Sequence, residues 1–122
     1  MKKILVIDDD RDIQIILCKA LERGGYEVIS ARDAMQGPML ARQQLPDLII
    51  LDVMMPAGGG KAVYARLKQS RHTTHIPILI YSAMPRNQVL TEMSVPDGPL
   101  IVTKPATIER ILALVGNTLA EK

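Results

Sequence analysis

Five polar side chains stand at or directly after the ends of short apolar runs: Asp8, Asp9, Asp52, Ser82 and Lys104. Three are carboxylates, one is a hydroxyl and one is an ammonium. Carboxylates about 4 Å apart repel one another by roughly 1 kcal/mol in water and about 4 kcal/mol at the dielectric of a protein surface. If the fold brings these side chains together, the cluster therefore needs a compensating cation.

Oxygen ligands without Cys or His favour Mg²⁺, Mn²⁺ or Ca²⁺, and a shallow site with few protein ligands favours Mg²⁺. A bound cation and Lys104 around one carboxylate would suit a transferred phosphoryl group. Each residue alone has a plainer interpretation. Asp9 could cap a helix, Ser82 could be a loop hydroxyl and Lys104 a surface charge. Their joint placement at the ends of four different runs favours a site.

The elements that must position these residues follow from the apolar pattern. Runs rich in β-branched residues, without alternation, are typical of strands buried on both faces. The segments between them have helical spacing. Five βα units in series predict one α/β domain over residues 1–122, with helices on both faces of a parallel sheet. The predicted strands are 4–7, 26–31, 47–52, 78–82 and 100–103, and the predicted helices are 11–23, 33–44, 61–69 and one from 108 onward. In such sheets, sites form beyond the carboxyl ends of the strands.

Three segments depart from the regular pattern. Asp33 suits the N-cap of the second helix, but Pro38 removes a backbone donor and should kink its first turns. Residues 55–60 read as a loop. Residues 84–99 contain one apolar face, interrupted at Pro96, so about two turns of helix are expected there. We expect this last segment to be the most mobile or irregular part of the fold.

Composition excludes several classes of protein. The net charge of +2 is too small to indicate nucleic-acid or membrane binding by this domain. No apolar stretch approaches the length of a membrane span, so a soluble, cytoplasmic protein is expected. Cys18 is the only cysteine, which rules out an internal disulfide and a zinc-type cysteine set. Its apolar neighbours predict a small buried filler on a helix.

Four runs together resemble the receiver domain of two-component response regulators, the CheY-like superfamily. They are Ile-Leu-Val-Ile-Asp-Asp-Asp (4–10), Pro-Asp-Leu-Ile-Ile-Leu-Asp-Val-Met-Met-Pro (46–56), Ile-Pro-Ile-Leu-Ile-Tyr-Ser-Ala (76–83) and Val-Thr-Lys-Pro (102–105). The resemblance covers essentially the whole chain, in order. It implies a flavodoxin-like, doubly wound sheet of five parallel strands in the order 2-1-3-4-5.

The resemblance also implies a metal site and a phosphoacceptor. Asp8 and Asp9 match the acidic pair that holds Mg²⁺, with Asp9 the direct ligand. Asp52 matches the residue that accepts a phosphoryl group from the phosphohistidine of a sensor histidine kinase or phosphotransfer protein. The backbone carbonyl of Met54 matches a further Mg²⁺ ligand. Such a domain is not an enzyme but a phosphoacceptor that assists its own phosphorylation and dephosphorylation, switching partner interactions in a phosphorelay.

The remaining matched positions surround the phosphoryl group. Ser82 supplies the hydroxyl and Ala83 the backbone amide that meet its oxygens, and Lys104 pairs first with the acceptor and then with the phosphoryl group. Pro105 matches a proline whose preceding peptide bond is commonly cis in this family. The resemblance allows a homodimer through the face formed by residues 84–122.

The sequence departs from the family pattern away from the phosphorylation site. Ile101 stands where Tyr or Phe is usual, and Ala106 where Phe is frequent. Loop 57–60 lacks the usual Met and Asp, and Pro96 and Pro99 replace a helix end and a turn. Because most of these positions lie on the face that reads out the signal, we expect the order of residues 84–99, more than a rotamer of residue 101, to change on phosphorylation.

Other interpretations of these residues fit the sequence less well. A haloacid-dehalogenase phosphatase needs a second acid where Met54 stands, and a phosphate loop would need Gly at Met55 and Ser or Thr at Ala62. His72 and His75 could pair on a metal, but they read better as surface residues. The serious alternative is a receiver-like interaction module that signals without phosphorylation.

Overall fold

The computed structural model describes residues 1–56, 59–93 and 100–120. Its strands form one parallel sheet in the order β2-β1-β3-β4-β5, which confirms the predicted topology. The strands are β1 (Lys3–Ile7), β2 (Glu27–Ala31), β3 (Leu48–Leu51), β4 (Ile78–Ser82) and β5 (Leu100–Thr103). The helices are α1 (Arg11–Arg23), α2 (Gln36–Gln44), α3 (Gly59–Gln69), α4 (Arg86–Glu92) and α5 (Ile108–Ala120).

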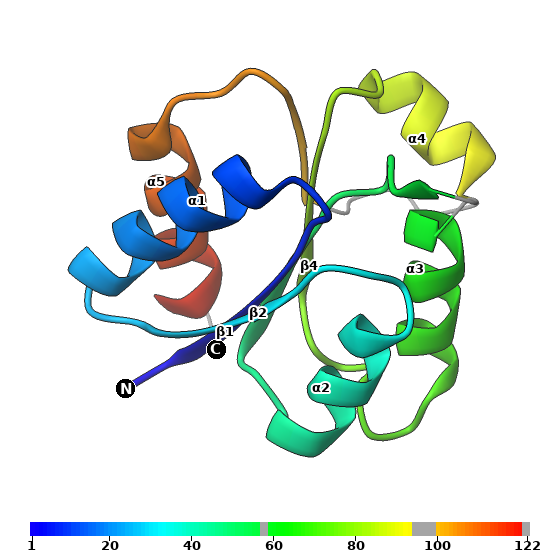
Figure 1. Ribbon diagram of the computed structural model, residues 1–122, viewed down its shortest axis with the longest axis horizontal. Coiled ribbons are helices and arrows are strands. Elements are labelled where there is room, and N and C mark those ends of the chain that lie inside the picture. Colours follow the sequence, from blue (N-terminus) through cyan, green and yellow to red (C-terminus); the bar gives the residue numbers. More distant parts are fainter. Residues whose placement is uncertain (57–58, 94–99, 121–122) are drawn as a thin grey trace.

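Two apolar cores lie on opposite faces of this sheet. Helices α1 and α5 cover one face, and α2, α3 and α4 cover the other (Figure 1). Alternate residues of β1 point to different faces: Leu5 and Ile7 pack with α2, α3 and α4, while Ile4 and Val6 pack with α1 and α5. The central strands are consequently buried along almost their whole length. This explains why they appear in the sequence as unbroken apolar runs rather than as alternating ones.

Helix α1 begins and ends where the sequence predicts. Asp10 is its N-cap, and its Oδ1 accepts hydrogen bonds from the amides of Asp12 at 2.9 Å and Ile13 at 3.2 Å. Gly24 stands at the C-cap. Because the cap fixes where the helix starts, Asp8 and Asp9 remain in the short turn between β1 and α1.

Helix α2 begins later than predicted, at Gln36. The side chain of Asp33 does accept hydrogen bonds from two backbone amides, those of Met35 at 3.0 Å and Gln36 at 2.7 Å, but in the turn that precedes the helix. Pro38 is consequently the third residue of α2. A first-turn amide has no partner within the helix, so the reason for the predicted kink disappears.

Helix α3 begins at Gly59, so the prediction of a loop through residue 60 was wrong at its end. A Cβ atom at Gly60 would lie 2.1 Å from the Cα of Val53, which no side chain can tolerate. The missing side chain at Gly60 therefore lets α3 start against the backbone that follows β3.

Helix α4 has seven residues, which confirms the expected two turns, with Pro85 as its N-cap. Residues 94–99 lie outside the described residues, and the expected change of order on phosphorylation stays a prediction. None of the described helices is long and apolar enough to cross a membrane.

Candidate functional site

Cross-strand hydrogen bonds bring the predicted site residues to one edge of the sheet. The amide of Asp8 donates to the carbonyl of Ala31 at 3.1 Å, and the amide of Asp52 donates to the carbonyl of Ile7 at 3.0 Å. The amide of Lys104 donates to the carbonyl of Ser82 at 2.8 Å. Each residue directly after a strand is thus held by the neighbouring strand.

The three predicted carboxylates do form a cluster. One oxygen each from Asp8, Asp9 and Asp52 lie within 4.8 Å of one another. Asp8 and Asp52 are buried, with 2% and 6% of their surface exposed, while Asp9 is exposed. The Nζ atom of Lys104 lies 3.3 Å from Oδ2 of Asp8 and 3.4 Å from Oδ2 of Asp52. When all three carboxylates are ionised, Lys104 leaves two negative charges uncompensated, and this donor set fits a divalent cation.

The pKa values of Asp8 and Lys104 are shifted in this cluster, which has more negative than positive charge. Burial raises the pKa of Asp8, and the charge of Asp52 raises it further against the opposing effects of the Asp10 amide and Lys104. Burial by itself would lower the pKa of Lys104, but attraction to Asp52 and Asp8 overrides it and raises that pKa. The ammonium is therefore held in its charged form between two carboxylates that lack full compensation.

Both buried carboxylates are oriented in the same way. Oδ1 of Asp8 accepts a hydrogen bond from the amide of Asp10 at 2.9 Å, and Oδ1 of Asp52 accepts one from the amide of Met54 at 3.0 Å. In each case the second oxygen, Oδ2, is the one that faces Lys104. An amide two residues further along the chain thus fixes each carboxylate, and the role of the Met54 carbonyl stays a prediction.

Ser82 lies at the same edge as the last residue of β4 and is fully buried. Its Oγ accepts a hydrogen bond from the amide of Met84 at 3.3 Å. The role assigned to the Ala83 amide stays a prediction. The bond between Lys104 and Pro105 is cis, as the resemblance implied.

Sequence reasoning missed Gln14, which holds the floor of the site. Its buried amide nitrogen donates to the carbonyls of Asp8 at 2.9 Å, Ala31 at 2.6 Å and Val6 at 3.2 Å. Cys18 is half-buried, and its Sγ lies 3.6 Å from Oε1 of Gln14. Burial and the nearby Glu22 raise the pKa of the Cys18 thiol. The hydrogen bonds that Gln14 donates connect α1 to the ends of β1 and β2. The available signal was a polar residue on the buried face of α1.

A second missed residue is Tyr81, whose ring centre lies 5.1 Å from Nζ of Lys104. A cation over an aromatic face is attracted by the quadrupole of the ring. Tyr81 precedes Ser82 on β4, and it pairs with Val102 of β5, the strand that directly precedes Lys104. The sequence offered little indication of this contact, because consecutive residues of a strand point to opposite faces of the sheet and Tyr81 directly precedes Ser82.

The arrangement is an acidic, partly buried pocket with one ammonium and one hydroxyl at its edge. It can hold a divalent cation and can present a carboxylate to an electrophile. Residues 4–116 match the sequence profile described as the response regulator receiver domain. The chain belongs to this family. Receiver domains are the phosphoacceptor modules of two-component systems, and they bind Mg²⁺ in the active site and interact with histidine kinases or phosphotransfer proteins.

Curated relatives support this assignment. The chain is 38% identical over 115 residues to the DNA-binding dual master transcriptional regulator RpaA of Synechocystis, covering 94% of this chain and 48% of RpaA. It is 28% identical over 120 residues to Protein PilH of Pseudomonas aeruginosa, covering 98% of this chain and 99% of PilH. The chain thus spans about half the length of RpaA but nearly all of PilH.

Solved structures have the same fold. The chemotaxis protein CheY4 of Vibrio cholerae superposes with a TM-score of 0.87 at 25% identity, over 97% of this chain and 98% of that chain. The receiver domain of the sensor histidine kinase PA1611 of Pseudomonas aeruginosa, with a magnesium ion coordinated in its active-site cleft, has a TM-score of 0.87 at 18% identity, over 98% of each chain. The flavodoxin-like fold predicted from the sequence is confirmed.

Proposed function

We propose that residues 1–122 form one receiver unit in which Asp52 accepts a phosphoryl group from the phosphohistidine of a sensor histidine kinase or phosphotransfer protein. The observation that carries the proposal is the position of Lys104, at 3.3 Å from Asp8 and 3.4 Å from Asp52, beside the cluster that Asp9 completes. A carboxylate beside an ammonium and a cation site is suited to nucleophilic attack on phosphorus.

In the proposed step, an oxygen of Asp52 attacks phosphorus in line with the departing imidazole nitrogen. The new O–P bond forms as the N–P bond breaks. The electron pair of the N–P bond stays on the imidazole, which leaves as a neutral ring when its other nitrogen carries a proton. The product is an acyl phosphate on Asp52. Water later hydrolyses it, which releases inorganic phosphate and regenerates the carboxylate. In this proposal the domain is not an enzyme but a phosphoacceptor that assists its own phosphorylation and dephosphorylation.

The residues around Asp52 have separate parts in this proposal. Asp8, Asp9, Asp52 and the Met54 carbonyl would hold Mg²⁺, which when bound supplies positive charge to the phosphoryl oxygens. Lys104 keeps its positive charge between the carboxylates and can follow the developing negative charge. The Ser82 hydroxyl and the Ala83 amide would donate to phosphoryl oxygens. The readout would be a change of partner interactions in a phosphorelay, including self-association through the face formed by residues 84–122.

Intact-mass measurement with acetyl phosphate as the donor tests the proposal. The wild-type chain should gain one phosphoryl group only when Mg²⁺ is present, and Asp52→Asn should gain none. Asp33→Asn is a matched control, because Asp33 is exposed and the side-chain oxygen of asparagine can accept the same hydrogen bonds from the amides of Met35 and Gln36. Equal uptake by wild type and Asp52→Asn, or uptake without divalent cation, would contradict it. Binding of Mg²⁺ without any uptake would favour the interaction module that signals without phosphorylation.

A further inference from the structure

The surface formed by α2, α3 and the loop after α3 carries positive charge only. No Asp or Glu occurs at positions 34–46 or 53–91. On the opposite face of the sheet, α1 carries two acidic residues, Asp12 and Glu22, together with three cations. The cations of α2, α3 and the following loop are Arg42, Lys61, Arg66, Lys68 and Arg71. Although the net charge of the chain is only +2, positive charge is therefore concentrated on the surface formed by α2, α3 and the following loop.

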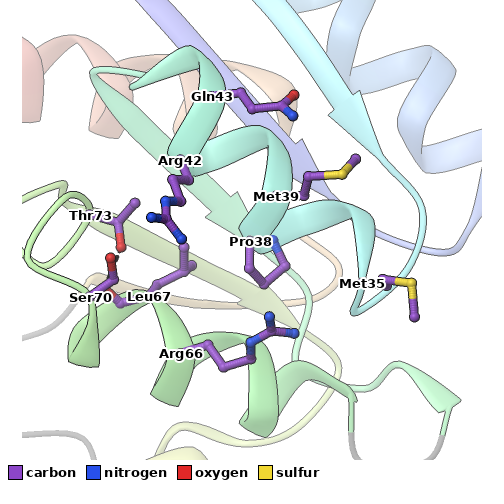
Figure 2. A pocket seen from close by; sticks show the side chains of 9 residues that line it. All are labelled: Met35, Pro38, Met39, Arg42, Gln43, Arg66, Leu67, Ser70 and Thr73. Carbon is purple, nitrogen blue, oxygen red and sulfur yellow. Dashed lines mark hydrogen bonds between the residues drawn. The ribbon is translucent and has the colours of Figure 1, made fainter.

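A groove of about 650 Å³ lies between α2 and α3. Figure 2 shows the guanidinium of Arg42 extending from α2 toward α3, and that of Arg66 extending from α3 below Pro38. Ser70 and Thr73, in the segment after α3, line the groove at one end. None of the described residues that line it is acidic. The groove thus presents two cations to whatever occupies it.

No carboxylate of the described residues neutralises either guanidinium. Within residues 1–56, 59–93 and 100–120, Arg42 and Arg66 have no ion-pair partner, and both residues are exposed. Elsewhere the chain does pair a surface cation, since Nζ of Lys3 lies 3.6 Å from Glu27. Two arginines that face one groove without a carboxylate favour an anionic occupant, because its charges remove the repulsion between the cations.

The same groove has an apolar side. Met39 and Met35, from α2 and the turn before it, line the groove and are 47% and 78% exposed. Leu45, the residue after α2, is also exposed. Methionine is flexible and polarisable, and exposed methionines are typical of surfaces that adapt to a partner. Pro38 is half-buried and adds a further apolar surface to the groove.

We propose that this groove binds an acidic, amphipathic helix of a partner protein. Its carboxylates would pair with Arg42 and Arg66, and its apolar side chains would pack against Met39 and Pro38. Single-stranded nucleic acid fits less well, because none of the described lining residues is aromatic and its bases would find no ring on which to stack. The inference does not depend on phosphorylation of Asp52.

A titration followed by amide NMR of the full ¹⁵N-labelled chain tests this proposal. The probe is a synthetic helical peptide with Leu along one face and Glu along the other. We expect its addition to shift the amide resonances of residues 35–43 and 66–73. The same peptide with Gln in place of Glu should bind about tenfold more weakly or worse, and added salt should weaken the acidic peptide, because exposed ion pairs are screened.

Paired charge reversals locate the binding surface. Arg42→Glu/Arg66→Glu should weaken the acidic peptide by about tenfold or more. The matched control is Lys19→Glu/Arg23→Glu, which reverses two exposed cations on α1 and should change binding by less than about twofold. Circular dichroism of each variant checks that the fold is retained.

Four results would overturn the proposal. They are shifts confined to other surfaces or absent at millimolar peptide, equal binding of the Gln peptide, and equal weakening by both double variants. The fourth is preference for another occupant. Tighter binding of a DNA duplex, or self-association in sedimentation that Arg42→Glu/Arg66→Glu abolishes, would assign the groove to nucleic acid or to a second copy of this chain.

Discussion

The acidic pocket at the strand ends and the basic groove between α2 and α3 place their charges in opposite ways. In the pocket, Asp8 and Asp52 are buried, each is hydrogen-bonded by an amide, and both face Lys104. In the groove, Arg42 and Arg66 are exposed and have no ion-pair partner among the described residues. The chain itself supplies the partners of the charges in the pocket, whereas the charges of the groove are left for an outside partner.

The two regions therefore differ in what the fold requires: the buried charges of the pocket need partners within the chain, and the exposed charges of the groove do not. Buried charges require positioned partners, because an uncompensated buried charge is costly. Exposed charges contribute little to stability and can be kept or exchanged without loss of the fold. Substitutions at the pocket and its supports should therefore cost stability or change metal binding, and substitutions in the groove should do neither.

Gly60→Ala should give the largest effect, a loss of about 3 kcal/mol or more in the free energy of unfolding. The added Cβ would lie 2.1 Å from the Cα and 2.3 Å from the carbonyl oxygen of Val53, so the backbone beside Asp52 must move. Urea unfolding measures the loss. At Gly59 an added Cβ would lie 3.2 Å from the Cβ of Ala34, so Gly59→Ala should cost less than about 1 kcal/mol. Equal losses would mean that the approach to Val53 is not what requires glycine.

Gln14→Leu should cost about 2 kcal/mol, because it leaves the carbonyls of Asp8 and Val6 in a buried position without their side-chain donor. The loss should appear in thermal unfolding and be accompanied by weaker Mg²⁺ binding, since Asp8 would lose its fixed position. Gln69→Leu, at an exposed position on α3, is the control and should change stability by less than about 0.5 kcal/mol. A neutral Gln14→Leu would show that the pocket needs no support from α1.

The sheet and the pocket could be predicted because both follow from local patterns. Unbroken apolar runs identify buried parallel strands, and the topology then brings the residues after those strands to one edge. Asp8, Asp9, Asp52 and Lys104 needed no further information to be placed together. Their positions are set by hydrogen bonds between neighbouring strands, which any correct register produces.

The supports of the pocket and the groove could not be predicted because they depend on approach in space. Gln14 appears in the sequence as one polar residue in an amphipathic helix, and its three acceptors lie on β1, in the turn after it and on β2. The start of α3 depends on how closely Gly60 approaches Val53. Arg42 and Arg66 belong to two different helices, and the spacing of residues in the sequence does not show that these helices form one groove.

Lys104→Ala tests whether the ammonium of Lys104 competes with the metal ion or is needed to bind it. Its ammonium lies 3.3 Å from a carboxylate oxygen of Asp8 and 3.4 Å from one of Asp52, so its removal should leave Mg²⁺ affinity unchanged or raise it by up to about tenfold. Calorimetric titration of Mg²⁺ measures this, with Lys19→Ala as the control on α1. Coupling between phosphorylation and partner binding should weaken at the same time. Abolished Mg²⁺ binding with the fold intact would show that Lys104 does not compete with the cation.

Arg42→Ala/Arg66→Ala should give the smallest effect and is the sharpest test of the comparison. Each guanidinium is exposed and has no ion-pair partner among the described residues, so its removal breaks no ion pair and should change the free energy of unfolding by less than about 0.5 kcal/mol. Uptake of a phosphoryl group from acetyl phosphate should remain as in wild type, because neither arginine belongs to the pocket. Urea unfolding and intact mass measure the two quantities on one sample. A loss of about 1 kcal/mol or more would mean that the arginines stabilise the packing of α2 against α3, and the contrast between an organised pocket and a surface left for a partner would then fail.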